Sequence, residues 1–276
     1  IVTGDHYSIG KPFFNFFFVP IMLVLSVALG CVPLLSWKKT SLKQIRRFLK
    51  KSFPVFLLIT TVVFYVLEFS FTVAFFCCVI GLWVAVNHFY DLYRRFREGL
   101  AYSLSYLGMQ FAHLGFAMTL VGVAFTSTFS IEEDIRMVPG DEYALGPLVV
   151  KFLGVSPIQG PNYVAQRGSF LVVDANDEVY KLLPEKRTYA GRQIMTEAGI
   201  EAGFFADTYI SMGEPLSREA WAVRLHYKPL VRWIWFGALL MALGGLISAG
   251  DYRYRKLLVS KQRLKPSGSA VGRTAS

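Results

Sequence analysis

The sequence has little charge for its length. Only 17% of its 276 residues are charged and 54% are hydrophobic, and the mean hydropathy is positive at +0.42. Water-soluble domains usually carry about 25% charged residues. The scarcity of charge therefore disfavours a soluble domain and makes a membrane protein the first expectation.

Cysteine is also scarce, and its positions give no sign of a disulfide framework or of a redox motif. Cys31, Cys77 and Cys78 all lie in apolar runs and form no C-x-x-C pair. The sequence thus offers no disulfide framework and no redox motif, so we expect small buried side chains at these positions. A starting methionine and a cleavable signal pattern are missing too, and we expect the chain to be the later part of a longer precursor.

Long apolar runs are abundant, and they divide the chain. A helix needs about twenty residues to cross the roughly 30 Å of hydrocarbon in a bilayer. Five spans are predicted, at residues 12–36, 53–68, 69–90, 104–129 and 229–250. The second and third belong to one apolar region that Glu68 interrupts, where we expect a tight turn at "LEFS", with a single kinked span as the alternative. Residues 1–128 thus hold four of the predicted helices.

Basic residues decide between four and five spans. They crowd into residues 38–51, residues 94–97 and the tail 251–276. Five spans place all three segments on the cytoplasmic side, as the positive-inside rule expects, whereas four spans would leave residues 94–97 outside. The net charge of +10 then reflects membrane orientation. Nucleic-acid binding, the alternative for a basic tail, is disfavoured in so apolar a chain.

Residues 130–228 form a polar segment on the outer side, where acidic residues outnumber basic ones. The stretches that predict strands are "PLVVKFLGV", "GSFLVVDANDEVYKLL" with a hairpin turn at "DAND", and "AWAVRLHY". We therefore expect a small antiparallel β domain between the fourth and fifth helices. Its sequence shows no Ser/His/Asp set, carboxylate pair, phosphate loop or metal cluster, which favours a role in contact over a role in chemistry.

Two of the predicted spans carry stripes of small residues. Helix positions three and four apart share a face. On the fourth span the stripe consists of Gly108, Ala112, Gly115, Thr119, Gly122 and Thr126. On the last span it consists of Ala238, Ala242, Gly245 and Ala249. Small residues let helix backbones approach closely in lipid, so we expect both stripes to be packing faces, and they are candidates to face each other.

His113 borders the stripe of the fourth span, inside the membrane. A polar ring in hydrocarbon needs a partner. Three kinds stay open: a neighbouring side chain, with Gln110 one candidate, a proton path, or a metal. The span has no Asp or Glu near His113 to continue a proton path. From the residues alone a hydrogen bond between helices is favoured, and ligation of haem beside the small residues is the alternative.

Four stretches of the chain resemble one known family. They are "YSIGKPFFN" at 7–15, "SYLGMQFAHLGFAMTLVGVAFTSTFSIEEDIRM" at 105–137, "PEKRTYAGRQIMTEAGI" at 184–200 and "WAVRLHYKPLVRWIWFGALLMALGGLISAGDYRYRK" at 221–256. In this order and spacing they are similar to the C-terminal part of CcmF, the membrane haem lyase of bacterial cytochrome c maturation. The resemblance implies a multi-pass protein of the bacterial inner membrane, with residues 130–228 on the periplasmic side.

The resemblance also implies a cofactor, a reaction and partners. His113, within "AHLG", matches an axial ligand of a haem b held among the membrane helices, and the small stripe would give the porphyrin or a neighbouring helix room to lie close. The family attaches haem to the C-x-x-C-H cysteines of apocytochrome c on the outer face. The implied partners are apocytochrome c, the haem-delivering chaperone, the thiol-reducing maturation subunits and membrane lipid.

Other parts of the family's machinery have no match in these residues. The second axial histidine and the Trp-rich segment that grips incoming haem belong to earlier parts of the family's sequence. We therefore expect this chain to act as part of the enzyme and not to catalyse alone, and no catalytic residue is assigned. The histidines that match no haem ligand are His6, His88 and His226, and each is expected at the surface or the membrane interface.

The basic residues that lead into the last span are Arg224, Lys228 and Arg232. We expect them to contact lipid headgroups, and a haem propionate is the alternative partner for one of them. Two other functions stay open for the whole chain. The first alternative to a haem lyase is a scaffold whose outer domain recruits partners. The second is half of a permease, although the broken helices typical of permeases are not indicated beyond Pro20 and Pro33.

Overall fold

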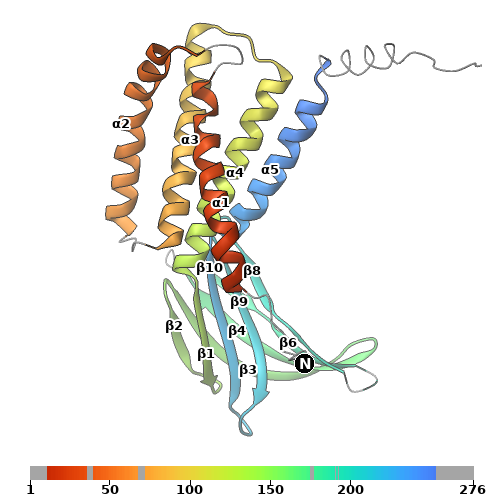
Figure 1. Ribbon diagram of the computed structural model, residues 1–276. Helices are drawn as coiled ribbons and strands as arrows, with labels where there is room; N and C mark the ends of the chain where they lie inside the picture. The colour runs from red at the N-terminus through yellow and green to blue at the C-terminus, as the bar shows by residue number, and fades with distance from the viewer. Residues whose placement is uncertain are drawn as a thin grey trace, which may run out of the picture.

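A bundle of helices stands on a β domain in the computed structural model, which describes residues 11–35, 40–67, 72–174, 177–189, 191 and 193–252 (Figure 1). The helices are α1 (Lys11–Cys31), α2 (Leu42–Leu67), α3 (Val73–Glu98), α4 (Leu104–Phe129) and α5 (Val231–Ala249), with a short 3-10 helix η1 (Val32–Leu34) after α1. The β domain lies between α4 and α5 in the chain. The predicted fold class, a helical membrane protein with an antiparallel β domain before its last helix, is confirmed.

Four of the described helices are long and apolar enough to cross a membrane: Leu42–Val66, Val73–Glu98, Leu104–Phe129 and Val231–Ala249. The apolar stretch around α1 and η1, Val19–Leu34, is shorter than a full span within the described residues. The chain therefore has four to five membrane helices, against the five that its hydropathy and charge predict.

The second and third helices are longer than the predicted spans. Helix α2 begins at Leu42, inside the basic segment, and α3 continues to Glu98. The added turns of α2 pack against the end of α3. Phe48 of α2 is buried with its ring 4.7 Å from that of Tyr90, and the guanidinium of Arg94 lies over Phe48. Gly99 ends α3 in a left-handed conformation, with φ of 62°. The predicted turn at "LEFS" falls largely on residues 68–71, outside the described residues.

Helices that follow one another in the chain run in opposite directions, so their ends fall into two groups (Figure 1). The start of α2, the end of α3 and the end of α5 lie at the end of the bundle away from the β domain. The basic residues of 43–51 and 94–97 therefore share that end, which is the arrangement that five spans predict. Lys38, Lys39 and the tail from Arg253 lie outside the described residues.

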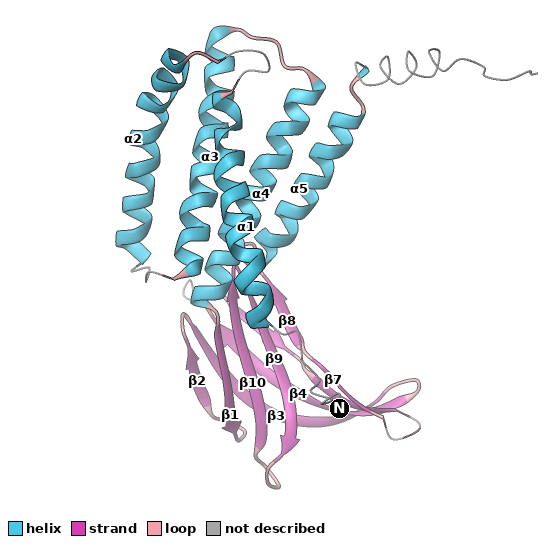
Figure 2. Ribbon diagram, viewed as in Figure 1, coloured by secondary structure: helices cyan, strands magenta, loops and turns pink. Residues whose placement is uncertain are grey.

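The β domain is a sandwich of two antiparallel sheets (Figure 2). Its strands are β1 (Ile131–Met137), β2 (Glu142–Leu145), β3 (Leu148–Gln159), β4 (Tyr163–Val173), β5 (Val179–Leu182), β6 (Glu185–Tyr189), β7 (Ile194–Glu197), β8 (Gly199–Ala202), β9 (Ala206–Pro215) and β10 (Trp221–Pro229). One sheet has the order β1-β10-β9-β8, and the other has the order β2-β3-β4-β6-β7 with β5 also paired to β4. The strand that follows α4 thus pairs with the strand that precedes α5, and this pairing brings the two helices together.

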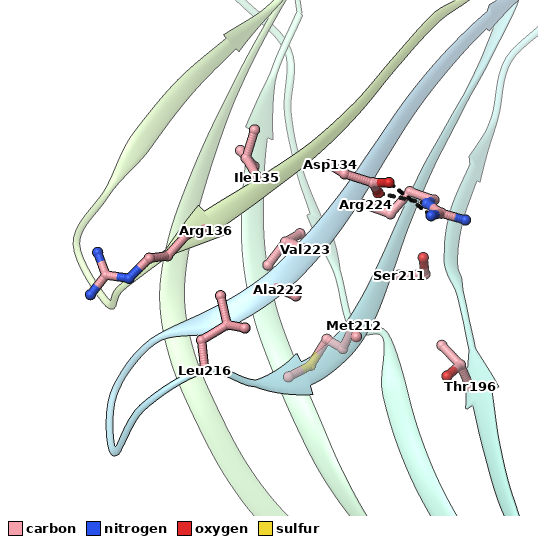
Figure 3. A pocket seen from close by; sticks show the side chains of 11 residues that line it. Asp134, Ile135, Arg136, Thr196, Ser211, Met212, Leu216, Ala222, Val223 and Arg224 are labelled. Atoms are coloured by element: carbon pink, nitrogen blue, oxygen red, sulfur yellow. Dashed lines mark hydrogen bonds and ion pairs between the residues drawn. The ribbon is translucent and has the colours of Figure 1, made fainter.

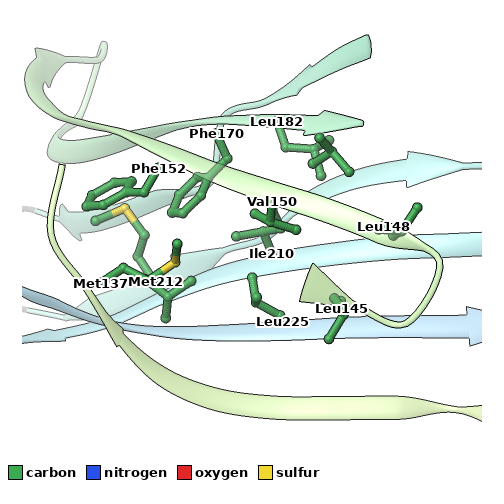
Figure 4. Close-up of a cluster of buried hydrophobic side chains, with 12 residues drawn as sticks. Met137, Leu145, Leu148, Val150, Phe152, Phe170, Leu182, Ile210, Met212 and Leu225 are labelled. Carbon is green, nitrogen blue, oxygen red and sulfur yellow. The ribbon is translucent and has the colours of Figure 1, made fainter. Parts of the chain in front are cut away.

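The core of the sandwich comes from alternate residues of both sheets. In β4, Phe170 and Val172 are buried while their neighbours are partly exposed. The ring of Phe170 stacks on that of Phe152 with centroids 4.7 Å apart, and Ile210 of the opposite sheet belongs to the same cluster (Figure 4). The predicted hairpin corresponds to β4 and β5, and its turn residues 175 and 176 lie outside the described residues.

Candidate functional site

The small stripe of α4 is covered by helix α5. A Cβ atom added to Gly115 would lie 2.6 Å from the carbonyl oxygen of Gly237, and one added to Gly244 would lie 2.5 Å from that of Gly108. Such distances leave room for glycine alone, so the two backbones are in direct contact. The stripe is thus a packing face, and a porphyrin has no space on it. Of the two neighbours expected for this stripe, a porphyrin or another helix, the structure shows the helix, because α5 fills the stripe.

The stripe predicted on α5 does not face the stripe of α4, because α5 packs on α4 through a different face. The residues predicted to form that stripe, Ala238, Ala242, Gly245 and Ala249, are all exposed in the structure. The contact is made by Gly237 and Gly244, which are seven residues apart and buried. Glycine at both positions lets the two helix backbones touch over two helical turns, whereas alanine would keep them further apart.

His113 lies on the side of α4 that faces α3. Its Nδ1 atom is 3.1 Å from Nε2 of His88 on α3, and the two rings meet edge to face with centroids 4.7 Å apart. His88 is completely buried, and the carbonyl oxygen of Leu29 on α1 lies 3.4 Å from its Nε2. The prediction that His88 is a surface or interfacial residue is therefore wrong. Helix α3 continues for ten residues beyond it, so His88 lies inside the bundle and not at its edge.

A chain of buried polar side chains continues from His88 toward the basic end of the bundle. Nδ1 of His88 is 2.8 Å from Oε1 of Gln110, and Nε2 of Gln110 donates to Tyr106 at 2.7 Å and to the Asp91 carboxylate at 3.2 Å. Tyr106 donates to Asp91 as well, at 2.8 Å. Arg94 closes the chain with an ion pair of 2.6 Å to Asp91. His88 and Asp91 on α3 therefore form one polar contact with three residues of α4.

The helical pattern explains why these side chains meet. His88, Asp91 and Arg94 are three residues apart on α3 and share one face. Tyr106, Gln110 and His113 follow spacings of four and three on α4. Sequence reasoning considered Gln110 as a partner of His113 but missed His88, Asp91 and Tyr106. The signal that identifies them is polar residues at helical spacing within two adjacent membrane spans.

The geometry leaves one nitrogen of His113 available. Its Nδ1 is engaged with His88, and within the described part of the chain Nε2 makes no hydrogen bond. An imidazole that uses one nitrogen in a hydrogen bond and presents the other is the usual form of a histidine metal ligand. Among the described residues no three His, Cys, Asp or Glu side chains cluster as a metal site. A lone histidine that presents one nitrogen is the form in which a protein supplies a ligand to haem iron.

Arg224 and Lys228 on β10, and Arg232 in the first turn of α5, lie at the β-sandwich end of the bundle. Arg224 forms two hydrogen bonds with Asp134, of 2.6 and 2.8 Å, Arg232 pairs with Asp207 at 3.0 Å, and Lys228 lies over the ring of Tyr209. The Arg224 hydrogen bonds hold the pKa of Asp134 below its ordinary value. All three basic side chains thus have partners within the chain.

Their distance from His113 follows from the contact between α4 and the end of β10. Thr126 donates to the carbonyl oxygen of Pro229 at 2.8 Å. Thirteen residues separate His113 from Thr126, which corresponds to about 20 Å along α4. Lys228 and Arg224 lie on the far side of that contact. Binding of a haem propionate by any of the three basic residues stays a prediction, and the geometry of His113 does not depend on it.

A pocket of about 580 Å³ lies on the β-sandwich, away from His113 (Figure 3). Strands β1, β9 and β10 line it, with Thr196 of β7, and the Asp134–Arg224 pair crosses one side. His226, on the same strand as Arg224, is mostly buried, and burial lowers its pKa. His6 lies outside the described residues.

Known proteins are similar to this chain in sequence or in fold. Residues 128–229 match the family model described as "CcmF C-terminal beta-sandwich". The chain is 39% identical over 271 residues to the cytochrome c-type biogenesis protein CcmF of Pseudomonas aeruginosa, covering 95% of this chain and 41% of that protein. It is 40% identical over 264 residues to CcmF of Escherichia coli, covering 94% of this chain and 40% of that protein.

A solved structure titled "Cytochrome c Heme Lyase CcmF" has the same fold. It superposes with a TM-score of 0.66 at 20% sequence identity, over 88% of this chain and 41% of that one. Fold and sequence together define a multi-pass membrane protein of cytochrome c biogenesis. The chain belongs to the CcmF family and corresponds to the C-terminal portion of its members. It spans about 40% of the length of the curated relatives it matches.

Proposed function

We propose that this chain is the C-terminal membrane portion of a cytochrome c haem lyase, in which His113 supplies one axial ligand to a haem b resident among the membrane helices. The observation that carries the proposal is the state of His113. Its Nδ1 is held by His88, and its Nε2 makes no hydrogen bond within the described residues. The relatives named above are cytochrome c biogenesis proteins, and the related solved structure is titled a haem lyase.

Bound haem would supply an iron able to exchange one electron. Around it, the residues of this chain act by position. The packed seam of α4 and α5 positions the helix that carries His113, because the glycine contacts hold the two backbones close together. His88 fixes the rotation of the imidazole. The second axial ligand and the segment that binds incoming haem are proposed to come from the remainder of the full-length protein.

The orientation proposed for the chain places the β-sandwich in the periplasm of a bacterial inner-membrane protein. The grouping of basic residues at the opposite end of the bundle supports it, since such residues favour the cytoplasmic side. There the sandwich is positioned to meet apocytochrome c, the haem-delivering chaperone and the thiol-reducing subunits. The reaction proposed for the complete protein is covalent attachment of haem to the C-x-x-C-H cysteines of apocytochrome c.

The test uses the full-length protein that contains these residues, with His113→Ala and the control variant His226→Ala. Pyridine haemochrome analysis of purified protein measures haem per polypeptide. The proposal predicts that His113→Ala loses most of its haem and recovers part of it in added imidazole, which replaces the missing ligand. His226→Ala should retain the wild-type amount, because its ring lies in the β-sandwich. Unchanged haem in His113→Ala contradicts the proposal and favours a scaffold role.

A further inference from the structure

We propose that His88 is a positioning residue for the haem ligand, which accepts the Nδ1–H of His113, fixes its tautomer and makes its Nε2 a stronger electron donor to iron. The inference rests on the proposed role of His113 as an axial ligand. It assigns a function to the buried chain of His88, Gln110 and Asp91, which Arg94 closes, that the ligand alone does not explain. The two proposals predict different behaviour for different variants, so they can fail separately.

The direction of each hydrogen bond follows from the acid at the end of the chain. The Asp91 carboxylate accepts a hydrogen bond from Tyr106 and forms an ion pair with Arg94. Because a carboxylate can only accept, the group of Gln110 that faces it must be the NH2. Oε1 of Gln110 then faces His88 and can only accept. Nδ1 of His88 therefore carries the proton that is shared over 2.8 Å with Gln110.

The tautomer of His88 fixes that of His113. A neutral imidazole with its proton on Nδ1 has a lone pair on Nε2. Two groups lie near that atom, Nδ1 of His113 at 3.1 Å and the carbonyl oxygen of Leu29 at 3.4 Å. The shorter distance lies within the usual range of about 2.7–3.2 Å for such bonds, and the longer one does not. His113 thus donates from Nδ1, and its Nε2 is left unprotonated, as a metal ligand must be.

Burial makes this arrangement persistent. His88 is 0% exposed, Gln110 3% and Asp91 3%, so water has little access to take the place of any member of the chain. Hydrogen bonds between buried groups are stronger than those in water. Loss of one partner leaves the other group buried without a hydrogen bond, which costs free energy. The bond from His113 to His88 therefore holds the imidazole ring in one rotation about its Cβ–Cγ bond.

The chain also changes the electronic character of the ligand. A histidine ligand that donates its second N–H to an acceptor becomes more basic, and such outer partners typically contribute about 10–100-fold to metal affinity. A more strongly donating ligand favours the oxidised iron, which lowers the midpoint potential of the haem. Removal of the acceptor at position 88 should therefore raise that potential. A contact that merely packs α3 on α4 would not affect it.

The test compares His88→Leu, His88→Gln and Val84→Ala in the full-length protein. Val84 is completely buried on the same helix as His88, one turn earlier, and has no hydrogen bond to lose, so Val84→Ala reports the effect of loosened packing alone. Midpoint potentials come from spectroelectrochemical titration of the purified proteins, and electron paramagnetic resonance of the ferric haem reports the strength of the axial ligands. Haem affinity and the apparent Tm are measured in the same samples.

The expected result is a more positive midpoint potential and about 10–100-fold weaker haem binding in His88→Leu. His88→Gln offers an amide oxygen to Nδ1–H and should return the potential toward that of the wild type. Val84→Ala should lower the apparent Tm without moving the potential. If His88→Leu does not fold, Gln110→Met breaks the next link of the chain and should shift the potential in the same direction by less.

Two results would overturn the inference and one identifies a deeper failure. A wild-type potential and ferric spectrum in His88→Leu, or a shift no larger than that of Val84→Ala, would show that His88 only packs the helices. If His113→Ala loses haem while His88→Leu behaves like the wild type, this inference fails and the proposed function stands. If His113→Ala keeps its haem and its potential, the proposed function fails and this inference fails with it.

Discussion

Single residues in this protein depend on their partners for their role, and His88 and Glu185 show this in two different solvents. In the membrane, His88 has its place because Gln110 and Asp91 complete its hydrogen bonds. In the β-sandwich, Glu185 is 6% exposed and bonded by Arg167 at 2.7 Å and Arg187 at 2.8 Å. Both are buried polar groups, and their hydrogen bonds offset the free energy that is lost when a polar group leaves water.

Replacing Glu185 by Gln should weaken the sandwich. Burial raises the pKa of Glu185, but the hydrogen bonds from Arg187 and Arg167 outweigh it, so the pKa lies below its ordinary value. Loss of the charged partner should cost about 1.5–3 kcal/mol. Hydrogen–deuterium exchange of the β4 and β6 amides measures the change. Glu197→Gln is the control and should cost less, because Glu197 is far more exposed and lies 3.3 Å from Arg187.

The pH dependence of that difference has a defined sign. A carboxylate with a lowered folded pKa stabilises the fold fully above its unfolded pKa, and this contribution is lost as the pH falls through the folded value. The gap in amide protection between the wild type and Glu185→Gln should thus be constant from pH 6 to pH 8 and shrink below about pH 4.3. A gap that grows on acidification would contradict this account of Glu185.

The sequence allowed the site to be predicted only in part, for reasons visible at single residues. His113 was found because a lone imidazole in an apolar span demands an explanation. His88 was missed because the predicted span ended at 90, which placed it near water, whereas α3 runs on to Glu98. Asp91 and Arg94 look like interfacial charges in a sequence, and only the neighbouring helix shows that the carboxylate is buried.

Pairs of elements show the same limit. The strands with alternating apolar residues, such as β3 and β4, were predictable from pattern. Short strands such as β7 and β8 have mixed sequences and form because β6 and β9 offer edges to pair with. The face of α5 that packs on α4 was mispredicted, since alanine and glycine look alike as small residues. Contact at backbone distance selects the glycines.

This distinction predicts opposite outcomes for two neighbouring glycines of α5. In Gly244→Ala the new methyl group would lie 2.5 Å from backbone atoms of Ala112 and Gly108, which must separate the helices. Gly245 has nothing within 4 Å of the same position.

We expect Gly244→Ala to lower the free energy of unfolding by about 1–3 kcal/mol through overpacking. Gly245→Ala should be neutral or slightly stabilised, because alanine favours helix. A thiol-reactive dye that detects exposure of the buried Cys78 on heating measures both. Equal apparent Tm values for the two variants would contradict the close packing of α4 and α5.

At the scale of the whole molecule, the β-sandwich is fastened to the bundle at one end. The backbone N–H of Leu230 donates to the Phe205 carbonyl oxygen at 2.7 Å, Arg232 pairs with Asp207, and the indole of Trp233 donates to Phe204 at 3.2 Å. The rings of Phe204 and Phe205 are exposed beside α5, as suits a membrane interface. These contacts hold the sandwich in a fixed position relative to the helix bundle.

The orientation is testable with single cysteines placed at opposite ends of the molecule. Ser217, in the turn between β9 and β10, and Glu98, at the end of α3, are both exposed. In intact cells, a membrane-impermeant maleimide should label Ser217→Cys at once and Glu98→Cys only after the membrane is permeabilised. The three native cysteines are replaced first. Labelling of both sites in intact cells, or of Glu98→Cys alone, would contradict a periplasmic sandwich.

The central claim is that His113 presents Nε2 to haem iron while His88 holds Nδ1. An experimental structure of the full-length, haem-loaded protein tests it most directly, at a resolution that shows the ring orientation. The account predicts iron bound to Nε2 of His113, Nδ1 within hydrogen-bond distance of His88, and helix α5 filling the glycine seam as described. Iron held by other residues, or a ring of His113 turned away from His88, would contradict it.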